Sequence, residues 1–395
     1  MASFDEILSK PSLFKNINIL SPHYVPNILP FRDGQISEIM NLISPALKNQ
    51  KPRNIFIYGK TGSGKTCTLK HIMHKFNVLN SKASMCYINC RIYNSRYRLM
   101  QKLLKQYDPS TDKSGFGLPF FYEKLIEFMN KGNHIIVVLD EIDMIKDLDE
   151  LIYTLTRIND EVSLGSLTII GISNRLSFKN ELDPRSKSSL YENEIMFPPY
   201  SSLQLKHILE QRVSEGFSEN AVESSAINLA AAITAQESGD ARYALKLLSK
   251  AGELAEQSNK TFISDEDVEL ARKKVEIDLM QEALSGLPEH HQLVLYAIVR
   301  LSSSNAPRYS RLAEDNSFDG FFLSGEVYEQ YSSLCTQLGK KSKTSRSFRE
   351  YINDLEMLGF IVSKVSSKGM RGQATLIKLG HESQDLLKIL EKIFS

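Results

Sequence analysis

The fold of this chain is decided by the stretch Gly59-Lys60-Thr61-Gly62-Ser63-Gly64-Lys65-Thr66, which matches the phosphate-binding pattern G-x-x-x-x-G-K-[ST] at every fixed position. An apolar strand is predicted before it, at Asn54–Tyr58, and an apolar helix after it, at Leu69–Phe76. Glycines let the backbone fold back so that successive N–H groups point at phosphate oxygens, and the helix N-terminus adds partial positive charge. We therefore predict a P-loop that binds ATP or ADP, in which Lys65 reaches the β- and γ-phosphates and Thr66 ligates Mg²⁺.

Short apolar runs alternate with helical patterns through the first 200 residues. They are Asn54–Tyr58, Ser84–Ile88, Ile135–Asp140, Leu167–Ile172 and Glu194–Phe197. Continuous apolar runs that alternate with helices are typical of a parallel sheet covered on both faces. The first part of the chain is therefore predicted to be an α/β nucleotide-binding domain with a parallel sheet and flanking helices.

Two carboxylates stand at the end of the run Ile135–Asp140. Ligands of open α/β sheets bind at the carboxyl ends of the strands, so we expect Asp140 and Glu141 to lie beside the P-loop. Asp140 is predicted to hold Mg²⁺ through water, and Glu141 to polarise the attacking water. The run Leu167–Ile172 is followed by Asn174, which is either a holder of that water or an ordinary turn residue, because both look the same locally.

The composition excludes several classes of protein. The chain has 395 residues and a formal net charge of +1, so nucleic-acid affinity would have to come from a local patch. No apolar run is long enough to cross a membrane, and the first residues do not form a signal peptide. We therefore expect a cytoplasmic protein without a membrane partner. Four scattered cysteines are too few for a disulfide framework.

Two further domains are predicted after the α/β domain, which we place at residues 1–200. Residues 201–278 have helical periodicity and are expected to form a separate helical unit. Residues 279–395 are predicted to form a winged helix, with Ser302–Phe322 as a polar surface loop. Its predicted helices are Gln292–Leu301, Gly325–Leu338 and Ser345–Leu358, and its predicted strands are Phe360–Val365 and Ala374–Leu379.

A basic patch lies in the predicted winged helix. Residues 340–378 hold nine basic and three acidic residues, a local net charge of +6 that attracts a phosphate backbone. On the predicted helix Ser345–Leu358, one stripe is apolar and another carries the side chains that suit base edges. The apolar stripe is Phe348, Ile352 and Leu355, and the polar one is Arg346, Arg349 and Asn353. Lys368 and Arg371 would lie at the tip of the wing, along the minor groove. The alternative is a domain that contacts only protein.

Taken together, these motifs resemble the AAA+ family and, more narrowly, the archaeal Orc/Cdc-type (origin recognition and cell division control) replication initiators. The resemblance spans nearly the whole chain in the order of the family. Besides the P-loop and the acidic strand end, it is carried by Pro26, Phe31–Gln35, Ile172–Asn174, Leu182–Arg185 with Ser188–Leu190, Phe197–Tyr200, Gly239–Arg242 and the C-terminal winged helix.

The resemblance implies roles for particular residues. Tyr24, Val25 and Pro26 would line the adenine pocket, with Arg32 nearby and Cys67 following the P-loop in the nucleotide site. Asn174 would be the first sensor, and Arg242 the second sensor on a helical lid. Arg185 would be an arginine finger for a neighbouring subunit, unless it forms only a surface salt bridge. An extra DNA-contacting helix is expected within Tyr107–Tyr122.

The resemblance also implies a function. A weak, switch-like ATPase would bind double-stranded origin DNA, assemble with other initiator subunits and help load the MCM replicative helicase in an archaeal, nucleoid-associated setting. A different class, the ATP-switched regulators of transcription or signalling, shares the P-loop, lid and winged helix. Glu141 and the Asp183-Pro184-Arg185 motif favour the initiator. A clamp loader is disfavoured, because clamp loaders end in a helical collar and not in a winged helix.

Overall fold

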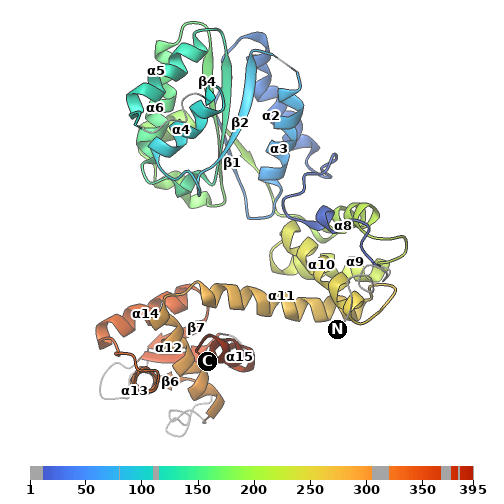
Figure 1. Cartoon of the computed structure of the whole chain (residues 1–395), viewed down its shortest axis with the longest axis vertical. Coiled ribbons are helices and arrows are strands. Elements are labelled where there is room, and N and C mark those ends of the chain that lie inside the picture. The colour runs from blue at the N-terminus through green and yellow to red at the C-terminus, as the bar shows by residue number, and fades with distance from the viewer. Residues whose placement is uncertain are drawn as a thin grey trace. The chain divides into compact units, whose positions relative to one another are not determined.

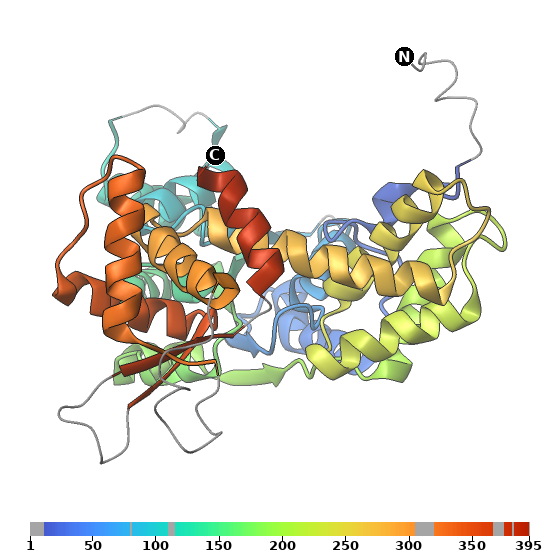
Figure 2. The ribbon, with the colours of Figure 1, turned by 90° about the horizontal axis from the view of Figure 1, so that it is seen from below.

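The computed structural model describes residues 12–79, 81–109, 115–304, 320–365, 375–380 and 383–394. The chain divides into two compact units, Met1–Ala271 and Arg272–Ser395. The boundary falls inside α11 (Asp265–Ser285), which Figures 1 and 2 show as one long helix. The division into three domains at residues 200 and 278 stays a prediction.

A five-stranded parallel sheet forms the centre of the first unit, in the order β2-β3-β4-β1-β5. All five predicted runs are strands, with ends that differ by at most one residue. The strands are β1 (Ile55–Tyr58), β2 (Ala83–Asn89), β3 (His134–Asp140), β4 (Ser166–Ser173) and β5 (Asn193–Met196). The register places Asp140 beside Asn89 of β2 and Ile172 of β4, so the acidic end of β3 lies between two neighbouring strand ends.

Helices cover both faces of this sheet, as predicted from the continuous apolar runs (Figure 1). Alternate residues of a strand point to opposite faces. Ile135, Val137 and Leu139 of β3 therefore pack with α4 (Arg96–Lys105), α5 (Leu118–Met129) and α6 (Leu148–Glu161). Ile136 and Val138 pack on the other face with α2 (Asp33–Ile43) and α3 (Lys65–Asn77).

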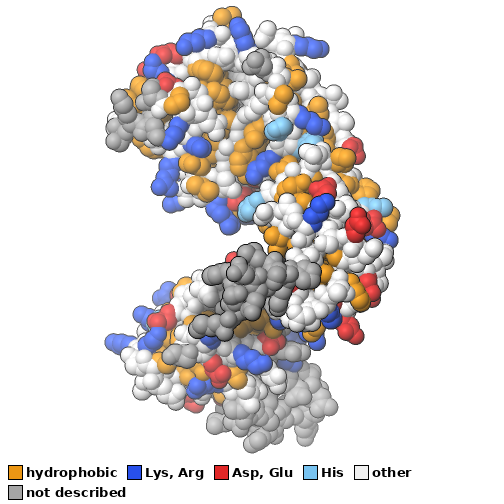
Figure 3. All heavy atoms as spheres, turned by 45° about the vertical axis from the view of Figure 1, so that its right-hand side comes forward, with side chains coloured by type: hydrophobic (Ala, Val, Ile, Leu, Met, Phe, Trp, Pro, Cys, Tyr) orange, Lys and Arg blue, Asp and Glu red, His pale blue; other side chains and the backbone are white. Residues whose placement is uncertain are grey.

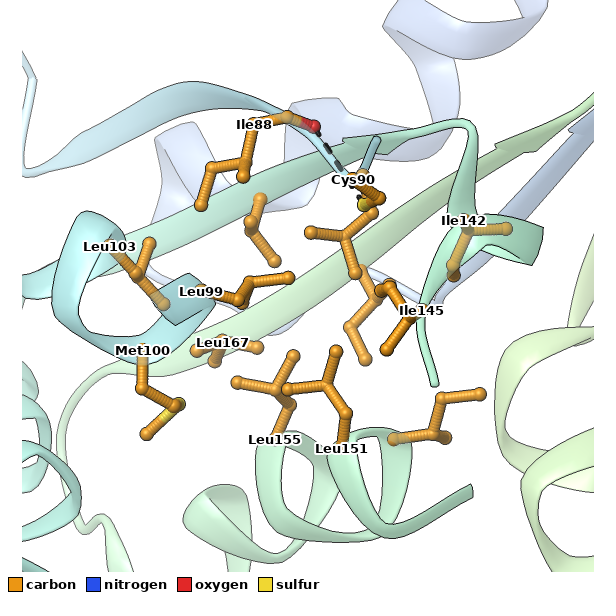
Figure 4. Packing of buried hydrophobic residues seen from close by; sticks show 14 of the residues in the cluster. Ile88, Cys90, Leu99, Met100, Leu103, Ile142, Ile145, Leu151, Leu155 and Leu167 are labelled. Carbon is orange, nitrogen blue, oxygen red and sulfur yellow. Dashed lines mark hydrogen bonds between the residues drawn. The ribbon is translucent and has the colours of Figure 1, made fainter. Parts of the chain in front are cut away.

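The first of these two cores reaches the acidic end of β3. Figure 4 shows Leu99 and Leu103 of α4 and Leu151 and Leu155 of α6 in one cluster with Ile142, which directly follows Glu141. Ile142 and all four leucines are 0% exposed, so the backbone that carries the carboxylates lies on a close-packed layer. Shorter elements complete this part of the chain: η1 (Ile17–Leu20), η2 (Ser44–Lys48), η4 (Ile142–Met144), η5 (Leu176–Asn180) and α7 (Pro184–Leu190).

A helical lid follows β5 within the same unit. It consists of α8 (Ser202–Gly216), α9 (Ser224–Glu237), α10 (Ala241–Gln257) and the first turns of α11. The N-terminal segment also packs on the lid, with the Phe14 ring centroid 4.8 Å from that of Phe217. The lid contacts the P-loop directly, because Ala241 N donates to Gly62 O at 3.3 Å.

The second unit is a winged helix. Its elements are α12 (Glu289–Ser304), β6 (Phe322–Leu323), α13 (Ser324–Gln337), α14 (Ser345–Met357), β7 (Ile361–Val365), β8 (Thr375–Leu379) and α15 (Ser383–Phe394). The strands form an antiparallel sheet in the order β6-β8-β7, and Figure 2 shows β7 beside β8. The predicted buried stripe of α14 is confirmed, since Phe348, Ile352 and Leu355 are 3%, 4% and 0% exposed.

The predicted polar loop Ser302–Phe322 is wrong at both ends. Helix α12 continues through Ser304. Phe321 and Phe322 are only 5% and 4% exposed, and Phe322 pairs with Ile377 in the sheet. The apolar side chains of two consecutive phenylalanines favour burial, which a polar loop cannot provide. Residues 305–319 of this loop lie outside the described part of the chain. Among the helices that the structure describes, none is long and apolar enough to cross a membrane.

Candidate nucleotide and DNA sites

The P-loop joins β1 to α3 and is shaped by glycines at which a larger residue would be strained or would clash. Gly62 has φ 66°, and a Cβ there would lie 1.6 Å from Asp240 Oδ1 of the lid. A Cβ on Gly59 would lie 2.2 Å from Phe197 O, which follows β5. The loop is therefore held closely between the end of the sheet and the lid, in a conformation that requires the predicted glycines.

Lys65 is a buried cation at the first position of α3, directly after Gly64 of the loop. It is 5% exposed, and its Nζ donates to Gly59 O and Lys60 O at 2.8 Å each. Burial lowers the pKa of Lys65 to about 8, against the opposing attraction of Asp140. A partly desolvated ammonium is a strong partner for a polyphosphate, since an anion relieves the cost of burying the charge.

Thr66 and Asp140 meet as predicted. Thr66 Oγ1 donates to Asp140 Oδ2 at 2.8 Å, although the two residues are 74 positions apart. Hydroxyl and carboxylate oxygens are the ligand type that Mg²⁺ prefers, and Mg²⁺ commonly keeps its other positions for water and phosphate. The pair therefore fits the proposed metal. Among the described residues no cluster of three or more His, Cys, Asp or Glu forms a metal site from the protein alone.

Tyr87 of β2 is a site residue that the sequence analysis missed. Its hydroxyl donates to Asp140 Oδ2 at 2.7 Å, the same oxygen that Thr66 contacts. Burial raises the pKa of Tyr87, with a further contribution from the hydrogen bond to Asp140, so this hydroxyl stays a donor. The signal was available, because Tyr87 lies near the carboxyl end of the strand beside β3.

Glu141 stands next to Asp140 in a strained backbone conformation. Its φ of 55° lies in the left-handed region, which non-glycine residues seldom adopt, and such outliers concentrate at functional sites. Its Oε2 lies 3.3 Å from Nε of the exposed Arg91, which follows β2. The two groups form an ion pair, but not an aligned hydrogen bond. Arg91 was not predicted.

The two predicted sensor residues lie near this site. Asn174 directly follows β4 and is two residues beyond Ile172, the register partner of Asp140. Arg242 lies in the first turn of α10, where its charge contributes to lowering the pKa of Lys65. The candidate finger Arg185 is exposed on α7.

Arg32 is engaged by the protein itself. It is 1% exposed, with Nε donating to Ser63 O at 3.0 Å and Nη2 to Pro198 O at 2.8 Å. Its guanidinium carbon lies 3.9 Å from the centroid of the Tyr200 ring. Arg32 therefore links the P-loop to the segment after β5. The sequence analysis expected Arg32 near the adenine pocket and did not predict this link.

The predicted adenine pocket lies where the N-terminal segment leaves the lid. Pro26 is buried, and Tyr24 and Val25 are half-buried. Tyr24 OH donates to Glu215 Oε2 of α8 at 3.1 Å. The guanidinium carbon of Arg212, also on α8, lies 4.7 Å from the centroid of the Tyr24 ring. Arg212 had no sequence signal, because one arginine on an amphipathic helix is normally solvent-exposed.

The second unit presents the predicted polar face of α14. Arg346, Arg349 and Asn353 are all exposed, and Arg346 Nε lies 3.8 Å from Glu350 Oε1. The helix begins after Thr344, whose side chain accepts from Ser347 N, and ends before Gly359, whose φ is 78°. Figure 3 shows Lys and Arg side chains on the surface of this unit. The predicted wing residues Lys368 and Arg371 lie outside the described residues.

The predicted DNA-contacting helix within Tyr107–Tyr122 stays a prediction, since the middle of that stretch, directly after the 3₁₀-helical Pro109, is not described. Its first residue packs inward, with the Tyr107 ring centroid 4.7 Å from that of Phe128. From Leu118 onward the chain belongs to α5, which covers the sheet. Residues 110–114 are not among the residues that the structure describes.

Comparison with known proteins now identifies the architecture. Three family models match in chain order: an AAA domain over residues 48–177, a Cdc6 AAA+ ATPase-type lid domain over 206–273 and a CDC6 C-terminal winged helix domain over 282–389. Among solved structures, the chain is similar to the Aeropyrum pernix ORC1 protein in complex with DNA, with a TM-score of 0.80 and 33% identity over 97% of this chain and 98% of that one. Cdc6p from Pyrobaculum aerophilum matches with a TM-score of 0.60 and 25% identity over 97% and 99%.

Curated relatives agree with this architecture. The ORC1-type DNA replication protein 1 of Archaeoglobus fulgidus is 40% identical over 99% of this chain and 94% of its own length. The ORC1-type DNA replication protein of Pyrococcus abyssi is 40% identical over 95% of this chain and 89% of its own. With its AAA+ domain, Cdc6-type lid and winged helix in one polypeptide, the chain belongs to the family of ORC1-type DNA replication proteins.

Proposed function

We propose that this protein is an ATP-dependent replication initiator that binds duplex DNA at origins and helps recruit or load the MCM replicative helicase. The observation that carries the proposal is that the Thr66–Asp140 pair at the P-loop and the exposed polar face of α14 belong to one chain. Family membership supports the role in replication, and the ORC1 relative solved in complex with DNA supports DNA as the partner.

The P-loop site would bind and slowly hydrolyse ATP. Backbone N–H groups of the loop and Lys65 would hold the phosphates, while Thr66 and Asp140 would hold Mg²⁺, which would supply charge neutralisation at the phosphates. Glu141 orients the attacking water and Asn174 helps to fix it. Arg242 approaches the γ-phosphate from the lid. Because hydrolysis would remove the group that Arg242 contacts, slow turnover acts as a switch and not as a motor.

The winged helix would read the DNA. Arg346 and Arg349 suit guanine edges or phosphates, and Asn353 suits adenine. Lys368 and Arg371 would follow the minor groove. Arg185 would act on the nucleotide of a neighbouring initiator subunit, since a guanidinium stays charged and donates in a fixed geometry.

Binding of origin and shuffled duplexes of equal length and composition tests the proposal. Origin fragments are taken from genomic DNA that co-purifies with the protein in cells. We expect tighter binding to the origin duplex at moderate salt, and retention of MCM on that duplex only when ATP and the initiator are both present. Equal affinity for both duplexes would contradict origin recognition, and co-purified DNA confined to promoters would favour the transcriptional regulator.

A further inference from the structure

Arg212 is a buried cation to which the proposed catalytic roles assign no task. It is 6% exposed, and its Nε and Nη1 have no hydrogen-bond partner within the described residues. A guanidinium stays protonated in proteins, so burial without partners costs free energy that a neutral side chain would avoid. An acceptor from outside the chain would remove this cost.

The surroundings of Arg212 indicate where that acceptor lies. Its guanidinium carbon is 4.7 Å from the centroid of the Tyr24 ring, at the predicted adenine end of the site. Cys67, the residue after Thr66 in the first turn of α3, lies close enough for the charge of Arg212 to oppose the rise that burial causes in the pKa of the Cys67 thiol. Arg212 therefore lies against the predicted adenine end and within electrostatic range of the helix that follows the P-loop, so the ribose and α-phosphate of a nucleotide bound there would pass near it.

The protein's own acid does not satisfy this charge. Glu215, three residues further along α8, attracts Arg212 but forms no ion pair with it in the described part of the chain. The carboxylate of Glu215 instead accepts from Tyr24 OH at 3.1 Å and from Gln211 Nε2 at 3.5 Å. The Nε and Nη1 groups of Arg212 therefore remain without an acceptor among the described residues.

We propose that Arg212 binds the α-phosphate of the nucleotide, with the face of its guanidinium resting on Tyr24. The proposal rests on nucleotide binding at the P-loop and deepens it. A cation of the lid would then hold the same nucleotide as Lys65 of the α/β layer, so the bound nucleotide would join lid and sheet through its α-phosphate as well as through Arg242.

Titration calorimetry with ADP on the full-length, nucleotide-free protein tests this role. Arg212→Met keeps an unbranched stem against Tyr24 but removes the charge, and we expect it to weaken ADP binding by about tenfold or more. Arg212→Lys should recover part of the affinity, since it keeps the charge without the planar fork. Lys206→Ala is the matched control, because Lys206 is a cation of the same helix that lies 3.8 Å from Glu210.

A second measurement separates phosphate contact from a merely structural role. The two diastereomers of ADPαS place sulfur on one or the other α-phosphate oxygen, so a charged hydrogen bond to one oxygen makes their dissociation constants differ. We expect their ratio to change by about threefold or more between wild type and Arg212→Met. If the wild type binds ADP and Arg212→Met binds it equally well, or leaves the ratio of the two ADPαS dissociation constants unchanged, the role of Arg212 is wrong. The proposed nucleotide site would still stand in that case. A wild type that binds no ADP overturns the proposed nucleotide site itself.

Discussion

At the scale of single residues, the carboxylate of Asp140 organises the acidic edge of the sheet. Its Oδ2 accepts from Thr66 and Tyr87, and its Oδ1 accepts from Glu141 N at 3.1 Å. One donor from α3, one from β2 and the neighbouring backbone N–H fix the orientation of this carboxylate. Tyr87 is therefore a positioning residue for the proposed metal ligand, comparable to the outer partners that orient ligands in other metal sites.

Replacing Tyr87 by phenylalanine removes one of these donors without removing the ring. We expect the Mg²⁺ concentration for half-maximal ATP hydrolysis to rise by about tenfold, while ADP affinity without Mg²⁺ stays unchanged. Tyr153→Phe is the matched control, since the Tyr153 ring is exposed and its hydroxyl accepts from the surface residue Arg157. An unaltered Mg²⁺ dependence in Tyr87→Phe would show that Thr66 alone orients Asp140.

The hydrolytic role of Glu141 makes a separate prediction. Glu141→Ala should preserve ATP binding and lower turnover by about a hundredfold or more, because the attacking water loses the carboxylate that polarises it. Filter binding and single-turnover hydrolysis measure the two quantities on the same preparation. Hydrolysis at the wild-type rate would contradict the assignment. Asp143→Ala, which removes a nearby acid assigned no role in catalysis, serves as the control.

The lowered pKa of Lys65 predicts a pH dependence. Free protein loses the Lys65 proton as the pH rises through about 8, whereas phosphate oxygens at the loop favour the charged form and raise this pKa. Nucleotide binding should therefore take up a proton between about pH 8 and 10 and weaken as the pH rises there, but take up almost none at pH 6.5. Calorimetry at pH 9 in two buffers of different ionisation enthalpy measures the uptake. Equal apparent enthalpies would contradict the prediction.

At the scale of elements, α14 combines a buried and an exposed stripe, and only the exposed one should matter for DNA. The logarithm of the DNA association constant falls linearly with the logarithm of the salt concentration. Arg349→Ala should make this slope less steep by about one, because one phosphate contact releases about one counterion. Lys388→Ala removes an exposed cation from α15 of the same unit and should leave the slope unchanged. Anisotropy titrations of a labelled duplex from 50 to 200 mM salt compare them; equal slopes for Arg349→Ala and wild type would place the contact elsewhere.

The elements predicted correctly from the sequence are those marked by an apolar run or a motif several residues long. Strands β1, β3 and β4 are buried along almost their whole length, so each reads as an apolar run, and the P-loop and Asp140–Glu141 follow from where such strands end. Strand β6 has only two residues, too few for any periodicity. Arg212 was missed for another reason: its burial depends on Tyr24, 188 positions earlier in the chain, and no local pattern on α8 records that contact.

At the scale of the whole molecule, the two proposed activities lie in different compact units. The P-loop and its lid belong to Met1–Ala271, and α14 belongs to Arg272–Ser395. Each unit has its own apolar core, represented by Leu103 in the first and Leu295 in the second, both 0% exposed. Separate cores permit separate unfolding, so nucleotide should stabilise one unit without the other.

Calorimetry of the full chain should therefore show two transitions, of which ADP raises only one. At a free concentration of 100 times its dissociation constant, ADP stabilises the unit that binds it by about 2.7 kcal/mol. Leu103→Ala should lower the ADP-sensitive transition and Leu295→Ala the insensitive one, each by about 2–5 kcal/mol of unfolding free energy. Lys65→Ala should abolish the response to ADP without moving the insensitive transition. A single transition that ADP shifts as a whole would mean that α11 joins the two units into one cooperative structure, and that nucleotide and DNA act on a common folding equilibrium.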